Sequence, residues 1–280
     1  FPTDLYILDG LGAQRTDLSL RLEGRDGDRL EDLIDEQVAV VLVNHVDYKT
    51  AALRDMAALT ARAHEAGAIV VWDLCHSAGV IPVELDACEA DFAVGCTYKY
   101  LNGGPGSPGF IYVARRHHEH LRQPLTGWWG HAEPFAFDSD YRPAPGIKAM
   151  LTGTQPILSM RALVAALAAC DRVDMAQVRA KSMALTDLFI TLVDEHCDGL
   201  GLELASPRDA ALRGSHVSFA HEGGFAVMQA LIACGVVGDF RAPDLLRFGL
   251  APLYIRYRDV ADAVEALRDI LVSQSWRDPA

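Results

Sequence analysis

The sequence predicts an α/β protein with two parts: a larger domain with a mostly parallel sheet over residues 1–160, and a smaller α+β domain over residues 161–280. Three apolar runs of strand length support the first part, at residues 38–43, 68–72 and 92–96. Such runs are typical of strands buried on both faces, and their alternation with helical segments favours a parallel sheet. Beyond residue 200 shorter strands mix with helices, which favours a separate α+β domain.

The other elements of the first domain follow from local patterns. Residues 18–22 (LSLRL) alternate as a short strand does, and residues 30–34 carry one short apolar helical face. Over residues 52–66 apolar side chains recur every three to four positions, which predicts a helix that ends at Gly67. Residues 109–114 supply a last strand.

Residues 121–146 have no period but are rich in Trp, Gly, Pro and His. Long irregular loops in compact domains are usually functional or disordered, and the aromatic content argues against disorder. The remaining elements are helices at residues 156–173, 174–195, 226–233 and 260–272, and strands at residues 215–220, 236–241 and 245–249.

Charge and hydropathy exclude some classes of function. The chain carries 38 acidic and 25 basic residues, for a net charge of −13, and shows no basic run. This balance argues against nucleic acid and anionic membranes as partners. The longest apolar runs, such as residues 38–43 and 162–170, are too short to span a bilayer.

Six cysteines occur without any Cys-x-x-Cys pair, mostly in apolar contexts. This pattern predicts buried free thiols in a reducing compartment. A metal site built from Cys75, His76, Cys88 and Cys96 fits no zinc spacing, so no metal is expected.

Two strand ends carry residues that point to chemistry. Lys99 lies between two tyrosines, after the strand at residues 92–96 and before a Gly/Pro-rich loop at residues 102–109. Asp73 ends the strand at residues 68–72. Ligands of open α/β sheets bind at the carboxyl ends of strands, so this amine and carboxylate would share one edge. The pair fits pyridoxal phosphate (PLP), which needs a lysine for its aldehyde and a carboxylate for its ring nitrogen. The alternatives are a surface lysine on a turn and a helix-capping Asp.

Six segments resemble kynureninase, a fold-type-I PLP enzyme of the aminotransferase class V group. They are NHVDYKT (44–50), WDLCHSAG (72–79), GCTYKYLNGGPG (95–106), QPLTGWWGH (123–131), GTQPIL (153–158) and LRFGLAPLY (246–254). The resemblance implies a PLP-dependent transferase-like fold and hydrolytic Cβ–Cγ cleavage of L-kynurenine to anthranilate and L-alanine in tryptophan catabolism. It also implies a cytoplasmic homodimer with shared active sites. Family members extend further at the amino end, so the chain resembles a kynureninase that lacks this segment.

The resemblance implies a role for each matching residue near the cofactor. Lys99 would bind PLP and move the Cα proton, and Asp73 would hold the ring nitrogen protonated. Tyr98 would bind the phosphate and assist proton transfer, with core packing as its alternative. His76 would orient Asp73 or the cofactor, and otherwise would be a structural histidine.

Further matches lie outside these two strand ends. Phe1 resembles the Phe that stacks on the pyridine ring, and Asp4 an Asp near the cofactor. Asn44 stands near the ring hydroxyl, where relatives carry Ser or Thr. Trp128 and Thr154 match positions that reach the cofactor of the neighbouring subunit, although Trp128 would otherwise anchor its own loop.

Two residues are expected to contact the substrate. Arg247 matches the arginine that binds the α-carboxylate, for which its planar fork is suited, and a structural salt bridge is its alternative. His131 is expected to line the substrate pocket. Two other functions stay open: a cysteine desulfurase relative and a truncated non-catalytic dimerisation module. A desulfurase would need a catalytic cysteine on a mobile loop near the carboxyl end, and Cys234, in the apolar helical run 226–234, matches this poorly.

Overall fold

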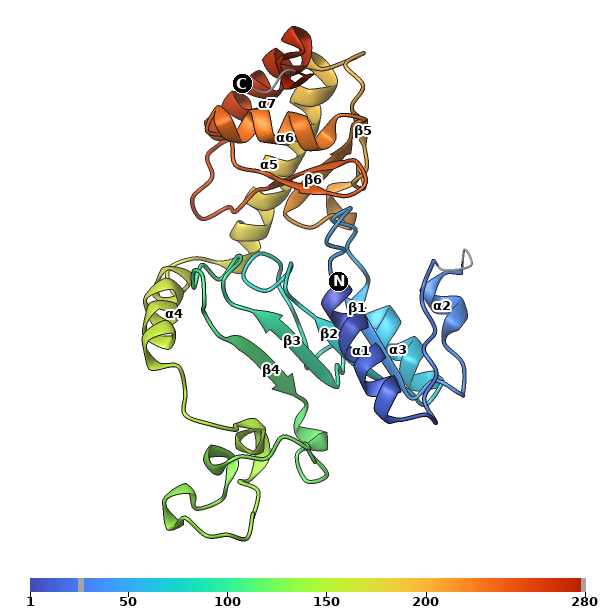
Figure 1. Ribbon diagram of the computed structural model, residues 1–280, viewed down its shortest axis with the longest axis vertical. Coiled ribbons are helices and arrows are strands. Elements are labelled where there is room, and N and C mark those ends of the chain that lie inside the picture. The colour runs from blue at the N-terminus through green and yellow to red at the C-terminus, as the bar shows by residue number, and fades with distance from the viewer. Residues whose placement is uncertain (25–27, 278–280) are drawn as a thin grey trace. The chain divides into compact units, whose positions relative to one another are not determined.

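The computed structural model describes residues 1–24 and 28–277. Contacts within the chain define two compact units (Figure 1). The first consists of Phe1–Val43, Asp55–Cys75 and Glu84–Ala168, and the second of Asn44–Arg54, His76–Val83 and Ala169–Ala280. The boundary expected near residue 160 stays a prediction.

The first unit is built on a four-stranded sheet in the order β1-β2-β3-β4 (Figure 1). The strands are β1 (Val40–Asn44), β2 (Ile69–Asp73), β3 (Phe92–Cys96) and β4 (Gly109–Val113). β2 and β3 run parallel, whereas β4 is antiparallel to β3. Four of the five strands predicted for this domain are therefore present, and the α/β class is confirmed.

Helix α3 (Met56–Glu65) packs on β2 through buried side chains. The indole nitrogen of the fully buried Trp72 donates a hydrogen bond to Thr60 Oγ1 at 3.1 Å. The helix begins later than predicted because Asp55 caps it, accepting a hydrogen bond from Ala58 N at 2.9 Å. Gly67 follows the helix with φ of 81°, a left-handed conformation that favours glycine.

The amino end differs from the expected pattern. Residues 18–22 form no strand, because alternation by itself supplies no partner for the backbone hydrogen bonds of a strand. Around Phe1 and Asp4, where no helix was predicted, the structure has helix α1 (Pro2–Gln14). Helix α2 (Leu30–Leu33) matches the predicted short helical face.

An irregular segment follows β4, as predicted. It contains only short 3-10 turns: η1 (Arg115–His117), η2 (Trp128–Gly130), η3 (Pro134–Ala136) and η4 (Gly146–Met150). The two helices predicted after it are confirmed as α4 (Ile157–Cys170) and α5 (Met175–His196).

The second unit contains an antiparallel sheet in the order β5-β6-β8-β7. Its strands are β5 (Glu203–Leu204), β6 (His216–Ala220), β7 (Asp239–Arg241) and β8 (Leu245–Gly249), with η5 (Ala210–Leu212) between β5 and β6. Helices α5, α6 (Gly224–Ala233) and α7 (Tyr257–Ser273) contribute to its core, and η6 (Ser275–Arg277) follows α7. The core includes Leu185, Phe189, Val217, Phe219, Leu231, Leu246, Val264 and Leu267. Three elements depart from expectation: β5 was not predicted, β7 begins three residues later than predicted, and α7 begins three residues earlier.

All six cysteines are free thiols, but their predicted burial is largely wrong. Cys197 alone among them is buried, and Cys234 is exposed. Within residues 1–24 and 28–277, no group of three or more His, Cys, Asp or Glu side chains could hold a metal ion. Over the same residues, no helix combines the length and apolar character needed to cross a membrane.

Candidate active site

β2 and β3 end side by side because they are parallel neighbours whose register pairs Asp73 with Val94. Asp73 is the last residue of β2 and is only 5% exposed. Its carboxylate accepts a hydrogen bond from the backbone N of Cys75 at 2.8 Å. Lys99 follows three residues after Cys96, the last residue of β3. The carboxylate and the amine singled out in the sequence thus lie at one edge of one sheet.

Backbone hydrogen bonds fix the turn that carries Lys99. The carbonyl oxygen of Lys99 accepts from Asn102 N at 2.9 Å, and that of Thr97 accepts from Gly103 N at 2.8 Å. A Cβ atom at Gly103 would lie 2.7 Å from Ser107 Oγ and 2.9 Å from the Thr97 carbonyl oxygen, so this close approach requires glycine. Lys99 is therefore presented, half-buried, by a defined turn.

Tyr98 lies beside Lys99 and is 52% exposed. The Lys99 ammonium nitrogen is 5.6 Å from the centre of the Tyr98 ring. Burial, followed by the neighbouring Cys96, raises the pKa of Tyr98. The phenol therefore stays protonated at neutral pH and can donate a hydrogen bond.

Asn44 and His76 lie at or just after the carboxyl ends of two strands. Asn44 is the half-buried last residue of β1. His76 lies three residues after Asp73 and is 7% exposed. The ring of His76 packs at 5.6 Å from the ring of His216, within the second unit. Their expected contacts with the cofactor stay predictions.

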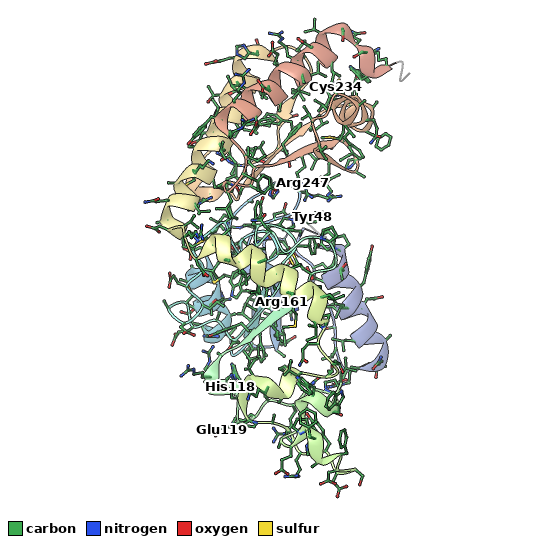
Figure 2. All side chains as sticks on the ribbon, turned by 90° about the vertical axis from the view of Figure 1, so that its left-hand side faces the viewer. Tyr48, His118, Glu119, Arg161, Cys234 and Arg247 are labelled. Carbon is green, nitrogen blue, oxygen red and sulfur yellow. The ribbon has the colours of Figure 1, made fainter. Side chains whose placement is uncertain are left out.

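Arg247 lies on β8, directly opposite Asp239 on β7. Its Nε and Nη2 atoms donate to the two carboxylate oxygens of Asp239 at 2.8 and 2.5 Å. Its Nη1 atom donates a hydrogen bond to the carbonyl oxygen of Tyr48 at 2.5 Å. Arg247 and Tyr48 are labelled in Figure 2. The structure therefore shows the salt bridge that was the alternative for Arg247, while substrate binding stays a prediction.

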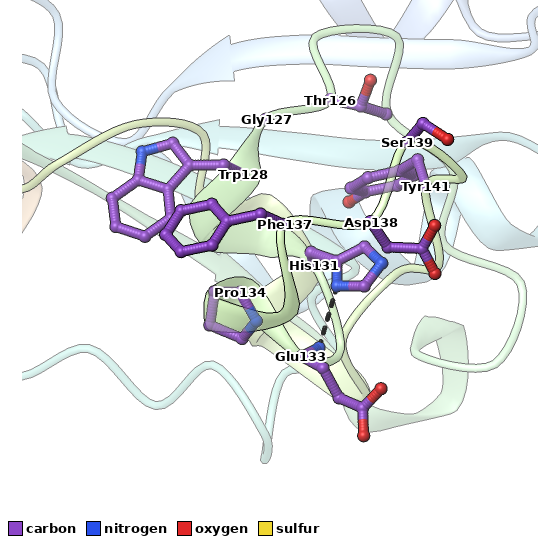
Figure 3. Close-up of a pocket in the computed structure, with 10 residues that line it drawn as sticks. All are labelled: Thr126, Gly127, Trp128, His131, Glu133, Pro134, Phe137, Asp138, Ser139 and Tyr141. Carbon is purple, nitrogen blue, oxygen red and sulfur yellow. Dashed lines mark hydrogen bonds between the residues drawn. The ribbon is translucent and has the colours of Figure 1, made fainter.

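The irregular segment after β4 forms a hollow of about 350 Å³ (Figure 3). Trp128 lines it and stacks on Phe137, with ring centres 6.5 Å apart. Trp128 also meets the rings of Trp129 and Phe135 edge to face, yet 40% of it remains exposed. The aromatic side chains of this segment are thus packed on one another, as the alternative for Trp128 required.

His131 lines the same hollow and is held by its own segment. Its Nδ1 atom accepts a hydrogen bond from Glu133 N at 2.9 Å, drawn as a dashed line in Figure 3. Its Nε2 atom then carries the proton and donates to the carbonyl oxygen of Asp140 at 3.2 Å. Thr154 is exposed and follows η4 in the connection to α4.

Phe1 and Asp4 belong to α1, as its N-cap residue and as an acidic residue of its first turn. Pro2 at the first helical position and an acid in the first turn both favour a helix start. No residue of α1 is buried. The expected contacts of Phe1 and Asp4 with a cofactor stay predictions.

Two features of this region were missed in the sequence. Asp239 was not recognised as the partner of Arg247, and Cys75 and Cys96 were considered together only as part of a metal site and not as neighbouring thiols. The second connection could have been found from parallel pairing, because Cys75 and Cys96 each follow two residues after the paired residues Asp73 and Val94.

The fold resembles that of solved cysteine desulfurases and related PLP-binding proteins. The cysteine desulfurase of Thermococcus onnurineus NA1 superposes with a TM-score of 0.77 at 21% identity, over 95% of this chain and 70% of that chain. C-DES with glycine covalently linked to its PLP cofactor gives 0.77 at 15% identity, over 96% of this chain and 72% of that chain. At these identities the likeness shows the fold, a PLP-dependent transferase-like one.

The family follows from the sequence comparison. Residues 178–267 match the model of the kynureninase C-terminal domain. Kynureninase of Burkholderia mallei is 52% identical over 280 residues, which are 100% of this chain and 67% of that protein. Kynureninase of Pseudomonas fluorescens is 50% identical over 277 residues, 99% of this chain and 66% of that protein. The chain belongs to the kynureninase family, and it spans about two thirds of the length of these curated relatives.

Proposed function

We propose that this chain forms the larger part of a PLP-dependent kynureninase. Such an enzyme hydrolyses the Cβ–Cγ bond of L-kynurenine, giving anthranilate and L-alanine in tryptophan catabolism. The observation that carries the proposal is an identity of 52% over all 280 residues with a kynureninase. The shared sheet edge of Asp73 and the Lys99 turn supports it independently.

The residues at this edge fit PLP. A buried carboxylate is stable when a cationic or hydrogen-bonding group faces it, and a protonated pyridine nitrogen is such a group. A primary amine stands after the neighbouring strand, where it suits an aldehyde carbon. When bound, PLP supplies a ring that withdraws electrons from the substrate. In this proposal Asp73 holds the proton on the ring nitrogen.

Lys99 has two tasks in the proposal. Its Nζ atom would hold PLP at the aldehyde carbon, and its amine would also serve as the base that moves the proton of the substrate Cα. Tyr98 contributes its phenol as a hydrogen-bond donor to the phosphate. The raised pKa of Tyr98 supports this role, because a protonated phenol does not repel the phosphate.

The remaining cofactor contacts come from the family. His76 orients the Asp73 carboxylate or the cofactor, and Asn44 donates to the oxygen of the ring hydroxyl. Phe1 stacks on the pyridine ring, and Asp4 lies near the cofactor. The half-buried position of Asn44 at the end of β1 supports its role, since ligands of α/β sheets gather at strand ends.

We further propose a cytoplasmic homodimer in which Trp128 and Thr154 reach the site of the partner. The exposure of 40% of Trp128, within a packed aromatic cluster, supports a surface that is completed by another chain. His131 lines the pocket for the substrate, and Arg247 binds its α-carboxylate. The free state of all six thiols fits a reducing compartment.

Covalent labelling tests the central assignment. Reduction with borohydride in the presence of PLP should attach the cofactor to Lys99, and peptide mapping should find it there. Lys99→Arg keeps the charge and should abolish both the label and the release of anthranilate from kynurenine. A label on Lys49 or Lys148 in the wild-type protein would refute the assignment.

A further inference from the structure

Two thiols lie together at the sheet edge that carries Asp73 and Lys99. Cys96 is the last residue of β3, and Cys75 follows β2 by two residues. The backbone pairing that joins β2 to β3 continues past Asp73, because Leu74 N donates a hydrogen bond to the carbonyl oxygen of Val94 at 2.8 Å. The register that joins Asp73 to Val94 thus brings Cys75 opposite Cys96.

The position of the two cysteines suits a covalent bond between them. The Cys96 thiol donates a hydrogen bond to the carbonyl oxygen of Cys75 at 3.7 Å, and the strand register places the two residues opposite each other. Neighbouring strands are about 4.8 Å apart, which lies within the range of Cα separations that a disulfide spans. Both residues are half-buried, so a small reagent can reach them.

The surroundings distinguish the two sulfur atoms. The Cys75 thiol, helped by Lys99, lowers the pKa of Cys96 to about 6 against the effect of burial. The contact with Cys96, together with burial and the Asp73 carboxylate, raises the pKa of Cys75. At neutral pH Cys96 is therefore the nucleophile, and Cys75 is a protonated thiol beside it.

We propose that Cys75 and Cys96 form a modification site for low-molecular-weight disulfides such as oxidised glutathione, which convert the pair to an intramolecular disulfide. The Cys96 thiolate attacks one sulfur of the reagent, forming a mixed disulfide and releasing one glutathione thiolate. Cys75 then loses its proton to water and attacks Cys96 Sγ, which releases the second glutathione thiolate. The two cysteines are oxidised by two electrons, and one glutathione disulfide is reduced to two thiols.

The disulfide has a consequence for the candidate active site, and this part rests on the proposed function. The backbone N of Cys75 donates a hydrogen bond to the Asp73 carboxylate, and the Cys96 thiol donates one to the carbonyl oxygen of Cys75. Joining the sulfur atoms removes both thiol hydrogens and constrains the chain between β2 and the Lys99 turn. Oxidation should therefore slow the attachment of PLP to Lys99, and reduction should restore it.

Mass spectrometry of the full chain tests the proposal directly. The protein is incubated with oxidised glutathione, its free thiols are alkylated, and it is digested without reduction. A peptide joining Cys75 to Cys96 is expected, which a reductant removes. In Cys75→Ser, a glutathione adduct should persist on Cys96, because the second thiol is missing.

Cys234 provides the matched control. It is an exposed free thiol at the C-cap of α6. It should acquire glutathione without forming an internal bond, and Cys234→Ser should leave the Cys75–Cys96 peptide unchanged. Recovery of Cys75 and Cys96 as alkylated thiols, while Cys234 of the same sample carries glutathione, would overturn the proposal. The mapping does not depend on catalysis, so its result stands even if kynurenine is not the substrate.

Discussion

At the scale of single residues, Asp91 joins three elements of the first unit. Its side chain is 3% exposed, and it accepts hydrogen bonds from His64 Nε2 on α3 and from Val70 N on β2, each at 2.8 Å. It also accepts hydrogen bonds from two residues of η1, from Arg116 Nη2 at 2.6 Å and from His117 Nε2 at 2.7 Å. Burial raises the pKa of Asp91, but these hydrogen bonds outweigh it and lower the pKa to about 2.

Asp91→Asn should therefore lower the free energy of unfolding at pH 7 by about 2–3 kcal/mol. Since folding lowers the pKa of Asp91 from its ordinary 3.8, its contribution is complete above that pH and disappears as the pH falls toward 2. Urea unfolding at several pH values measures the difference, which should shrink in acid. Asp17→Asn is the control: Asp17 also has a pKa of about 2, but its side chain is 63% exposed, so its loss should change the midpoint little.

Arg247 has two possible duties that one pair of variants separates. If it binds the substrate carboxylate, Arg247→Ala should cost about 2–5 kcal/mol in transition-state binding, or roughly 30- to 4000-fold in kcat/KM. Asp239→Asn breaks the ion pair but keeps the guanidinium, so it should retain much more activity. PLP absorbance and melting temperature are measured beside turnover. If both variants lower the melting temperature equally and keep near-normal kcat/KM, Arg247 has only a structural role.

At the scale of elements, the segment from η2 to η4 depends on a close backbone approach at Gly130. A Cβ atom there would lie 2.3 Å from the carbonyl oxygen of Leu151. The same glycine also accepts hydrogen bonds from Ala144 N at 2.8 Å and Tyr141 Oη at 3.1 Å.

Gly130→Ala should loosen this segment, because such overpacking costs about 1–3 kcal/mol. Trypsin should then cut after Lys148 roughly tenfold faster or more, since cleavage follows the population of the open form. Gly153→Ala is the matched control, because a Cβ atom at Gly153 meets nothing within 4 Å. Unchanged cleavage in Gly130→Ala would contradict a tightly packed segment.

Strand pairing also limits what could be predicted at this scale. β2 and β3 were predictable because buried parallel strands are continuous apolar runs. The helices α5 and α7 were predictable because each repeats apolar side chains along one face. The strand prediction for residues 18–22 was wrong. Their alternation resembles that of a strand, but no partner strand exists for them among the described residues. The antiparallel direction of β4 has no local signal at all.

At the scale of the whole molecule, the proposed homodimer makes a sharing test possible. Mixing a Lys99→Ala chain with a Trp128→Ala chain should restore activity if Trp128 acts across subunits, because each hybrid dimer then holds one intact site. Random mixing predicts about a quarter of the wild-type activity. If both residues act within one chain, the hybrids stay inactive even when their formation is confirmed by mass spectrometry.

The sequence by itself determined the α/β class, the positions of Asp73 and Lys99 after apolar strands, and the likeness to kynureninase. These depend on local composition and on motifs that stay together along the chain. Only the tertiary structure decided that Arg247 pairs with Asp239, that Asp91 joins α3, β2 and η1, and that Cys75 meets Cys96. Each of these contacts joins residues from different elements. Their energies depend on strand register and packing, and residues separated along the chain carry no local pattern that specifies which of them will meet.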